Sequence, residues 1–287
     1  MLELPKSAAE KIREYTGRIL HVHPVGGGCI NRCFQLLASQ GPFFLKTNDA
    51  GRHPGMFEAE AAGLERLLAC GALRVPKAMH CGHADNTAFL LMEFMDTGAQ
   101  MPGFWSDFGT SLANLHRQGS EAFGLDHNNY IGSLPQSNRQ HDLWTDFFIE
   151  ERLLPQLIKA RDGHKADKSI VERFDRLFTK LDDIFPVEPP SLLHGDLWNG
   201  NFMCGPDGHA CIYDPAIYFG HREMDIAMSR LFGGFDEAFY ASYNLSYPME
   251  SAWVKRLDIC NLYPLLVHVN LFGGGYMEQV KQIIRPF

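Results

Sequence analysis

The sequence predicts an α+β fold of two lobes, in which a small antiparallel sheet with one helix precedes a larger, mainly helical part. Short apolar runs separated by turn residues dominate the first 94 residues. Residues 95–103 follow with the Gly, Pro and Asp content of a linker. Beyond them, apolar residues recur mainly at helical spacing. We therefore expect an N-terminal lobe at 1–94 and a C-terminal lobe at 95–287.

Each element of the N-terminal lobe has its own local signal. Charges on most faces of the first segment predict a short helix, and apolar runs on either side of a triple glycine predict two strands joined by a turn. Phe57, Ala61, Leu64 and Leu68 recur at helical spacing. The expected elements are a helix at 3–16, a strand–turn–strand unit at 21–37, a strand at 43–47, a helix at 56–70 and strands at 78–83 and 87–93.

The C-terminal lobe is expected to be helical, with a few short strands between the helices. The expected helices lie near 104–118, 142–160, 166–183, 222–231, 235–244, 250–271 and 276–284, and the expected strands near 191–193, 201–204 and 209–213.

Composition excludes several classes of protein. The 287 residues include 26 basic and 34 acidic ones, a net charge of −8, which argues against a nucleic-acid binder or a membrane-surface protein, since either would need a basic face. Residues 1–20 carry charges throughout, and no apolar run approaches the ~20 residues that a spanning helix needs. The seven cysteines form no CxxC pair. We expect a reduced protein of the cytoplasm, either monomer or homodimer.

The strongest chemical signal lies at the end of a predicted strand. His194-Gly195-Asp196 follows an apolar run, Asn201 comes five residues after Asp196, and Asp214 ends the next apolar run. This spacing is typical of a kinase-type phosphoryl-transfer centre, H-x-D-x-x-x-x-N followed by a metal-binding Asp. Asp196 is the predicted base, and Asn201 and Asp214 are the predicted Mg²⁺ ligands.

The N-terminal lobe supplies the residues that such a centre needs for ATP. Gly26-Gly27-Gly28 lies in a turn that could cover the phosphates, and Lys46 ends the third strand. Glu60 is the preferred partner of this lysine over Glu58, because it lies four residues before Leu64.

The segment that joins the lobes, LLMEFMD at 90–96, resembles the hinge of a kinase. Its backbone around Glu93, Phe94 and Met95 would meet the adenine, although an edge strand running into a loop predicts the same residues. No DFG or APE motif follows Asp214, which indicates a small acceptor rather than a peptide.

At this point the chain resembles the fructosamine kinase (ketosamine 3-kinase) family, which has a protein-kinase-like fold and is related to aminoglycoside phosphotransferases and choline kinases. The resemblance runs nearly end to end and rests on these blocks: GGGCIN at 26–31, FFLKTN at 43–48, MFEAEAAGLERL at 56–67, FGLDHNNYIGSLPQSN at 123–138, WTDFFIEERLLPQL at 144–157, HGDLWNGN at 194–201, DPAIYFGHREMDIAMSRLFGGF at 214–235 and LYPLLVHVNLFGGGY at 262–276.

The resemblance implies ATP-dependent phosphorylation at O3 of ketoamines, with Mg²⁺. The 3-phosphate eliminates and releases the amine, so the family serves in deglycation repair. Ribulosamines or erythrulosamines are the expected acceptors, ahead of fructosamines, and the ketoamine can be free or protein-bound. The alternatives are a kinase of another small hydroxyl compound, of the aminoglycoside- or choline-kinase type, and an inactive nucleotide-binding module.

Several further residues are candidates with a structural alternative. Trp198 could stack on a ketose ring or pack under its loop. His221 and Glu223 could face the acceptor, or an Arg222–Asp225 pair could brace the helix start. His268 could line the acceptor site or be a core histidine.

Cys29, in the Gly-rich turn, is a redox candidate, since an anion-attracting turn lowers the pKa of a thiol. A disulfide between two copies of this turn is one form that such a response could take. A small residue chosen to fit a tight turn is the alternative.

Overall fold

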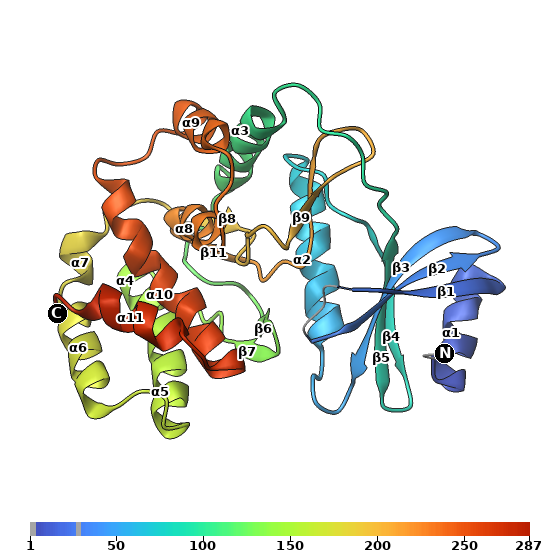
Figure 1. Cartoon of the computed structure of the whole chain (residues 1–287), viewed down its shortest axis with the longest axis horizontal. Helices are drawn as coiled ribbons and strands as arrows, with labels where there is room; N and C mark the ends of the chain where they lie inside the picture. The colour runs from blue at the N-terminus through green and yellow to red at the C-terminus, as the bar shows by residue number, and fades with distance from the viewer. Residues whose placement is uncertain (1–3, 27–29) are drawn as a thin grey trace. The chain divides into compact units, whose positions relative to one another are not determined.

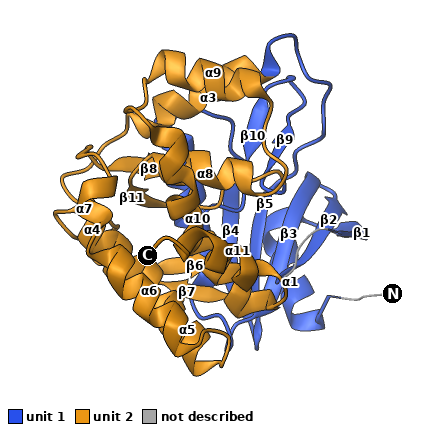
Figure 2. Cartoon of the chain, turned by 60° about the vertical axis from the view of Figure 1, so that its left-hand side comes forward, with its two compact units in different colours: residues 1–104, 200–215 blue, residues 105–199, 216–287 orange. Residues whose placement is uncertain are grey.

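The computed structural model describes residues 4–26 and 30–287 and consists of two compact units, coloured separately in Figure 2. One unit comprises residues 1–104 and 200–215, and the other comprises residues 105–199 and 216–287. The first unit thus extends beyond the boundary expected at residue 94 and includes a segment from much later in the chain.

The first unit is built on an antiparallel sheet with the strand order β1-β2-β3-β5-β4 (Figure 1). The helices α1 and α2 both pack against β4 and β5. The bounds of these elements are α1 (Lys6–Thr16), β1 (Ile19–Val25), β2 (Arg32–Ala38), β3 (Gly41–Asp49), α2 (Met56–Cys70), β4 (Ala78–Ala84) and β5 (Thr87–Glu93).

Alternation of side chains along the strands gives this sheet its core. Phe34 and Leu36 on β2, Leu45 on β3 and Phe89 on β5 are buried together with Ile12 of α1. Residues two apart on a strand share a face, so the apolar alternation of the sequence builds one continuous apolar layer. This layer fixes the register in which Lys46 of β3 lies opposite Leu90 of β5.

Residues 200–215 belong to the first unit because they form a hairpin bonded to it. The antiparallel strands β9 (Phe202–Cys204) and β10 (Ala210–Ile212) pair with each other, and Ile212 donates its N–H to the Arg74 carbonyl at 3.0 Å. Gly98 donates to the Cys204 carbonyl at 3.0 Å. These contacts join residues more than a hundred positions apart, which a search for local composition changes does not detect.

The second unit is mainly helical, as expected, with α10 packed against α8, α5 and α11 (Figure 1). Its elements are α3 (Phe104–His116), β6 (Asn129–Ile131), β7 (Leu134–Gln136), α4 (Trp144–Phe147), the π-helix η1 (Phe148–Leu153), α5 (Leu154–Asp162), α6 (Lys168–Phe178), α7 (Leu181–Ile184), β8 (Ser191–Leu193), β11 (Tyr218–Gly220), α8 (Glu223–Leu231), α9 (Glu237–Ser246), α10 (Trp253–Phe272) and α11 (Tyr276–Ile284).

Three details of this unit differ from the expectation. The helix expected over 142–160 contains the π-helical turn η1, and the helix expected over 166–183 is two helices. The short strand pairs β6–β7 and β8–β11 bring in strands at 129–131, 134–136 and 218–220 that the sequence pattern did not predict. Strands of three residues are too short to show a period of two.

Within residues 4–26 and 30–287, none of the helices has both the length and the apolar character needed to cross a membrane.

Candidate active site

A buried lysine joins two carboxylates in the first unit. The Nζ of Lys46 lies 2.6 Å from Oε1 of Glu60 and also forms an ion pair with Oδ1 of Asp214. Lys46 is 3% exposed, whereas the Asp214 side chain is 42% exposed. Glu58, the alternative partner, is exposed on α2. The structure therefore brings together Lys46, Glu60 and Asp214, and the lysine partner is Glu60.

The charges in this cluster control one another. Burial lowers the pKa of Lys46, but the Asp214 and Glu60 carboxylates outweigh burial, so its pKa is raised and the ammonium stays charged. Burial also raises the pKa of Glu60, although Lys46 opposes this shift. Asp214 is the exposed member, so it is the carboxylate that a ligand can reach.

The hairpin β9–β10 sets the two predicted metal ligands at one end of the first unit. Asn201 precedes β9 and Asp214 follows β10, and Tyr213 donates its N–H to the Asn201 carbonyl at 3.0 Å. Asp214 has a left-handed backbone (φ 58°), a conformation that Asp tolerates better than most residues. The amide of Asn201 and the carboxylate of Asp214, which this hairpin brings to neighbouring places, form a donor set that fits Mg²⁺, since Mg²⁺ prefers oxygen ligands.

The hinge residues end the sheet of the first unit. Glu93 is the last residue of β5, and its Oε2 accepts a hydrogen bond from the backbone N–H of Lys77 at 3.3 Å. Phe94 and Met95 follow it and are half-buried. Of the predicted glycine turn, Gly26 is exposed, whereas Gly27, Gly28 and the redox candidate Cys29 lie outside the described residues.

In the second unit, a buried carboxylate holds the loop that carries Asp196. Oδ2 of Asp225 accepts the N–H of His194 at 2.7 Å, and Oδ1 accepts that of Gly195 at 2.9 Å. Gly195 has a φ of 80°, and a Cβ there would lie 2.1 Å from the Ala216 carbonyl oxygen, so only glycine fits. The backbone of this loop is therefore fixed by Asp225 and by the close packing of Gly195.

Asp225 is anchored in turn from two other helices. His116 of α3 contacts both Asp225 and Tyr243 of α9. Its Nε2 is 3.2 Å from Oδ2 of Asp225, and its Nδ1 is 2.8 Å from the Tyr243 hydroxyl. Burial would raise the pKa of Asp225, but the bonds from His116 and from the Gly195 N–H outweigh burial and lower it. From the sequence, a pair with Arg222 was one alternative for Asp225. A chain separation of 31 residues leaves no local signal for its contact with His194.

A half-buried group of aromatic rings lies beside the same loop. The Trp198 ring meets Phe232 edge-on at a centroid distance of 5.5 Å, and Phe232 lies 4.8 Å from His268. His268 also contacts Tyr276, at 5.0 Å. Its Nδ1 lies 2.8 Å from the Pro264 carbonyl, so this nitrogen carries the proton and Nε2 is an acceptor. Trp198 and His268 are thus brought together, with Phe232 between them.

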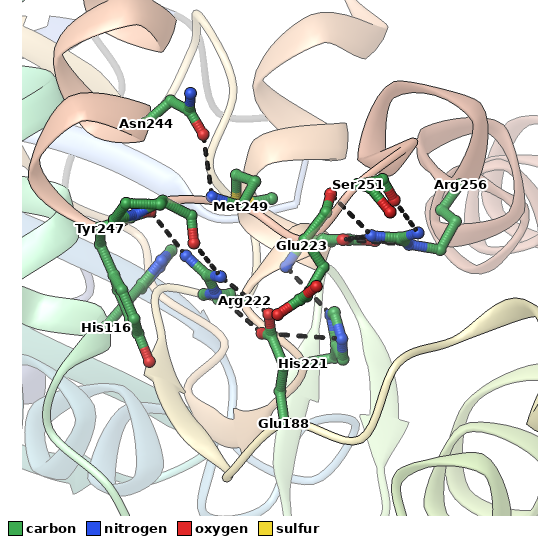
Figure 3. Close-up of polar contacts among 12 residues, drawn as sticks. His116, Glu188, His221, Arg222, Glu223, Asn244, Tyr247, Met249, Ser251 and Arg256 are labelled. Carbon is green, nitrogen blue, oxygen red and sulfur yellow. Dashed lines mark hydrogen bonds and ion pairs between the residues drawn. The ribbon is translucent and has the colours of Figure 1, made fainter.

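His221 and Glu223 differ from the sequence expectation, because neither side chain has an exposed surface that an acceptor could contact. Both are 0% exposed. Oε2 of Glu223 accepts a hydrogen bond from Nε of Arg256 at 2.8 Å (Figure 3). Arg222 forms an ion pair with Glu188 at 2.7 Å and not with Asp225. A carboxylate this deeply buried is stable only when it is paired, and pairing is its role here.

His221 should make the protein sensitive to acid. Burial lowers its pKa from 6.5 to about 4, although Glu188, 3.7 Å from Nε2, opposes the shift. The unfolded chain therefore takes up this proton first, and unfolding free energy falls between pH 6.5 and 4 by roughly 3 kcal/mol. Urea unfolding across this range should show a smaller loss for His221→Phe than for the wild type. Equal losses would contradict the prediction.

A family model described as fructosamine kinase matches residues 3–287, almost the whole chain. The chain belongs to the fructosamine kinase family. It is accordingly a kinase that transfers phosphate from ATP, with a protein-kinase-like, two-lobed α+β fold.

Named relatives of this fructosamine kinase match the chain over most of their own length. A Synechocystis protein named "Probable ketoamine kinase" is 40% identical over 98% of this chain and 95% of its own length. The chloroplastic protein-ribulosamine 3-kinase of Arabidopsis thaliana is 39% identical over 94% of this chain and 83% of its own.

Solved structures agree on the fold. A crystal structure of a protein assigned as a fructosamine-3-kinase from Thermobifida fusca has a TM-score of 0.87 and 35% identity, and covers 98% of both chains. An aminoglycoside phosphotransferase in a ternary complex with AMP-PNP and hygromycin B has a TM-score of 0.70 at 14% identity, covering 98% of both chains. The second likeness is one of fold alone.

Proposed function

We propose that this protein phosphorylates O3 of ketosamines at the expense of ATP, with ribulosamines and erythrulosamines ahead of fructosamines. The buried Lys46–Glu60–Asp214 cluster carries the proposal, because it supplies a fixed cation for phosphates beside a reachable carboxylate. The names of the relatives, ketoamine kinase and protein-ribulosamine 3-kinase, support this choice of acceptor. The product 3-phosphate would eliminate and release the amine, which is a repair of glycation.

ATP would be bound by the first unit. Lys46 would pair with the α- and β-phosphates, with Glu60 fixing its position, and the turn at Gly26, Gly27 and Gly28 would cover the phosphates. The backbone of Glu93, Phe94 and Met95 would meet the adenine. Since Glu93 already uses its carboxylate on the Lys77 N–H, specificity for the base would come from main-chain groups.

Asn201 and Asp214 would hold a magnesium ion, because their amide and carboxylate oxygens suit its chemistry. When bound, this ion neutralises charge on the phosphates. The Asp214 side chain is 42% exposed, so it could contact this ion as well as Lys46.

Asp196 would accept the proton of the sugar 3-hydroxyl as O3 attacks the γ-phosphorus of ATP. The O3–phosphorus bond forms, the bond from phosphorus to the β-phosphate oxygen breaks, and ADP leaves with that electron pair. The carboxylate then holds the proton until solvent removes it. The Asp225 bonds to the backbone of His194 and Gly195 keep the loop in place during this transfer.

Trp198 and His268 would bind the acceptor. The indole face suits a ketose ring, and the free Nε2 of His268 suits a sugar hydroxyl, since Nδ1 is committed to Pro264.

Trp198→Ala should raise KM for the ketoamine about tenfold and leave KM for ATP unchanged, since a stacked ring contributes about 0.5–1.5 kcal/mol beyond its buried area. Trp198→Phe keeps an aromatic face, so its KM for the ketoamine should lie between those of the wild type and Trp198→Ala. Steady-state kinetics with each substrate varied in turn provides the measurement. An equal rise in both Michaelis constants would show that Trp198 only supports its loop.

The test of the proposed function is ADP release from Mg²⁺–ATP with synthetic ribulose-lysine, erythrulose-lysine and fructose-lysine. Freshly mixed ribose and lysine, the uncondensed precursors of ribulose-lysine, is the matched control. ADP formation that requires the ketoamine, with a 3-phosphate detected by ³¹P NMR, is the expected result. ATP binding without ketoamine-dependent turnover would point to another acceptor.

A further inference from the structure

A π-helical turn sets an arginine into the core of the second unit. The π-helix η1 (Phe148–Leu153) interrupts the helix that runs from Trp144 to Asp162, and Arg152 lies near its end. An extra residue in a helical turn changes which side chains face inward, and such turns recur at functional sites. Arg152 is 0% exposed as a result.

This arginine is buried without an ion pair. Within the described chain, the buried Arg222 and Arg256 pair with Glu188 and Glu223, whereas Arg152 pairs with no carboxylate. Its NH1 donates to the Ser137 carbonyl at 2.6 Å and its NH2 to Oδ1 of Asn138 at 2.7 Å, while its Nε has no hydrogen-bond partner among the described residues. A buried charge with neutral partners is expensive to keep.

Aromatic rings partly offset this cost and connect the arginine to the catalytic loop. The guanidinium carbon lies 4.0 Å from the centroid of Tyr218 and 4.5 Å from that of Phe147. A Cβ on Gly195 would lie 3.4 Å from the Tyr218 ring, so the loop glycine packs against this ring. The stack of arginine, tyrosine and loop backbone fixes the position of the residue that precedes Asp196.

A second connection runs through Tyr263 of α10. Its hydroxyl donates to Oε1 of Gln136, and Nε2 of Gln136 donates to the Ala216 carbonyl at 3.2 Å. Ala216 in turn donates its N–H to the His194 carbonyl at 2.9 Å. The guanidinium carbon of Arg152 lies 5.4 Å from the centroid of the Tyr263 ring, so this chain of hydrogen bonds also begins beside the arginine.

We propose that Arg152 is a positioning residue for phosphoryl transfer, whose cationic stack on Tyr218 supports the catalytic loop. This assigns a role to the block at 129–138, since Gln136 and Asn138 hold Tyr263 and Arg152 in place. The proposal rests on the proposed function, because its main readout is kinase activity.

The test compares three variants that separate charge from hydrogen bonding. Arg152→Lys keeps the charge, Arg152→Gln keeps donors without charge, and Arg152→Met keeps neither. For Arg152→Gln and Arg152→Met, kcat per folded molecule should fall about 100-fold or more, with KM for ATP within twofold. The kcat of Arg152→Lys should be at least tenfold higher than that of Arg152→Gln. Equal losses for Lys and Gln, or a loss explained by the folded fraction alone, would overturn the proposal.

Arg256→Gln is the matched control, because it also removes a buried arginine and should lower thermal stability without a selective fall in kcat. If the Arg152 variants do not fold, Tyr263→Phe keeps the ring and should lower kcat threefold to tenfold at unchanged KM for ATP. Wild-type kcat in that variant would overturn the proposal. A wild type inactive on every ketoamine would contradict the proposed function instead, and the Arg152 comparison would then be made on acceptor-independent ATP hydrolysis.

Discussion

Asp196→Asn should lower kcat for ketoamine phosphorylation by roughly 10²- to 10⁴-fold, the contribution expected of a positioned general base. Asparagine has the same shape as aspartate but cannot take the hydroxyl proton. The substitution keeps the Asp225 anchors of the loop, since Asp225 accepts the backbone N–H groups of His194 and Gly195. KM for ATP should therefore stay within about twofold.

The control for this variant is Asp175→Asn, which makes the same chemical change at an exposed position of α6. It should retain the wild-type rate and the wild-type melting temperature. Steady-state kinetics and thermal unfolding of both variants provide the measurement. If Asp196→Asn kept more than a tenth of wild-type kcat, another group would have to be the base.

The placements that the sequence predicts correctly are those that depend on local spacing. Glu60 was preferred to Glu58 because it shares a helix face with Leu64, and the structure pairs it with Lys46. Asn201 and Asp214 flank two short apolar runs, and pairing of those runs as a hairpin brings their chain positions together. Such patterns can be recognised in the sequence because the periods of helices and strands determine them.

The residues that the sequence missed depend on contacts between distant segments. A pair of Arg222 with Asp225 was one of the two alternatives that the sequence offered, but Arg222 pairs with Glu188 and Asp225 accepts hydrogen bonds from the catalytic loop. His221 and Glu223 lie close to Asp214 in the chain, but the start of α8 turns both into the interior. Proximity in sequence is therefore a poor guide to which polar side chains reach a substrate, because burial is decided by packing.

Lys46→Met should lower kcat/KM for ATP by roughly 10²- to 10³-fold, since it removes the fixed cation that meets the phosphates. It should also lower stability by about 3–5 kcal/mol, because the buried Glu60 carboxylate loses its partner. The raised pKa of Lys46 keeps its ammonium charged throughout the working pH range. The fold-loss of kcat/KM should therefore not depend on pH between 6 and 9.

A double variant separates these two effects of Lys46. Lys46→Met with Glu60→Gln removes both buried charges, so stability should return toward that of the wild type, since a neutral amide costs less to bury than an unpaired carboxylate. Activity should not return, because the phosphates still lack their cation. Glu60→Gln alone keeps Lys46 and should lose less activity than Lys46→Met. If the double variant regained activity with stability, Lys46 would serve the fold of the first unit and not the nucleotide.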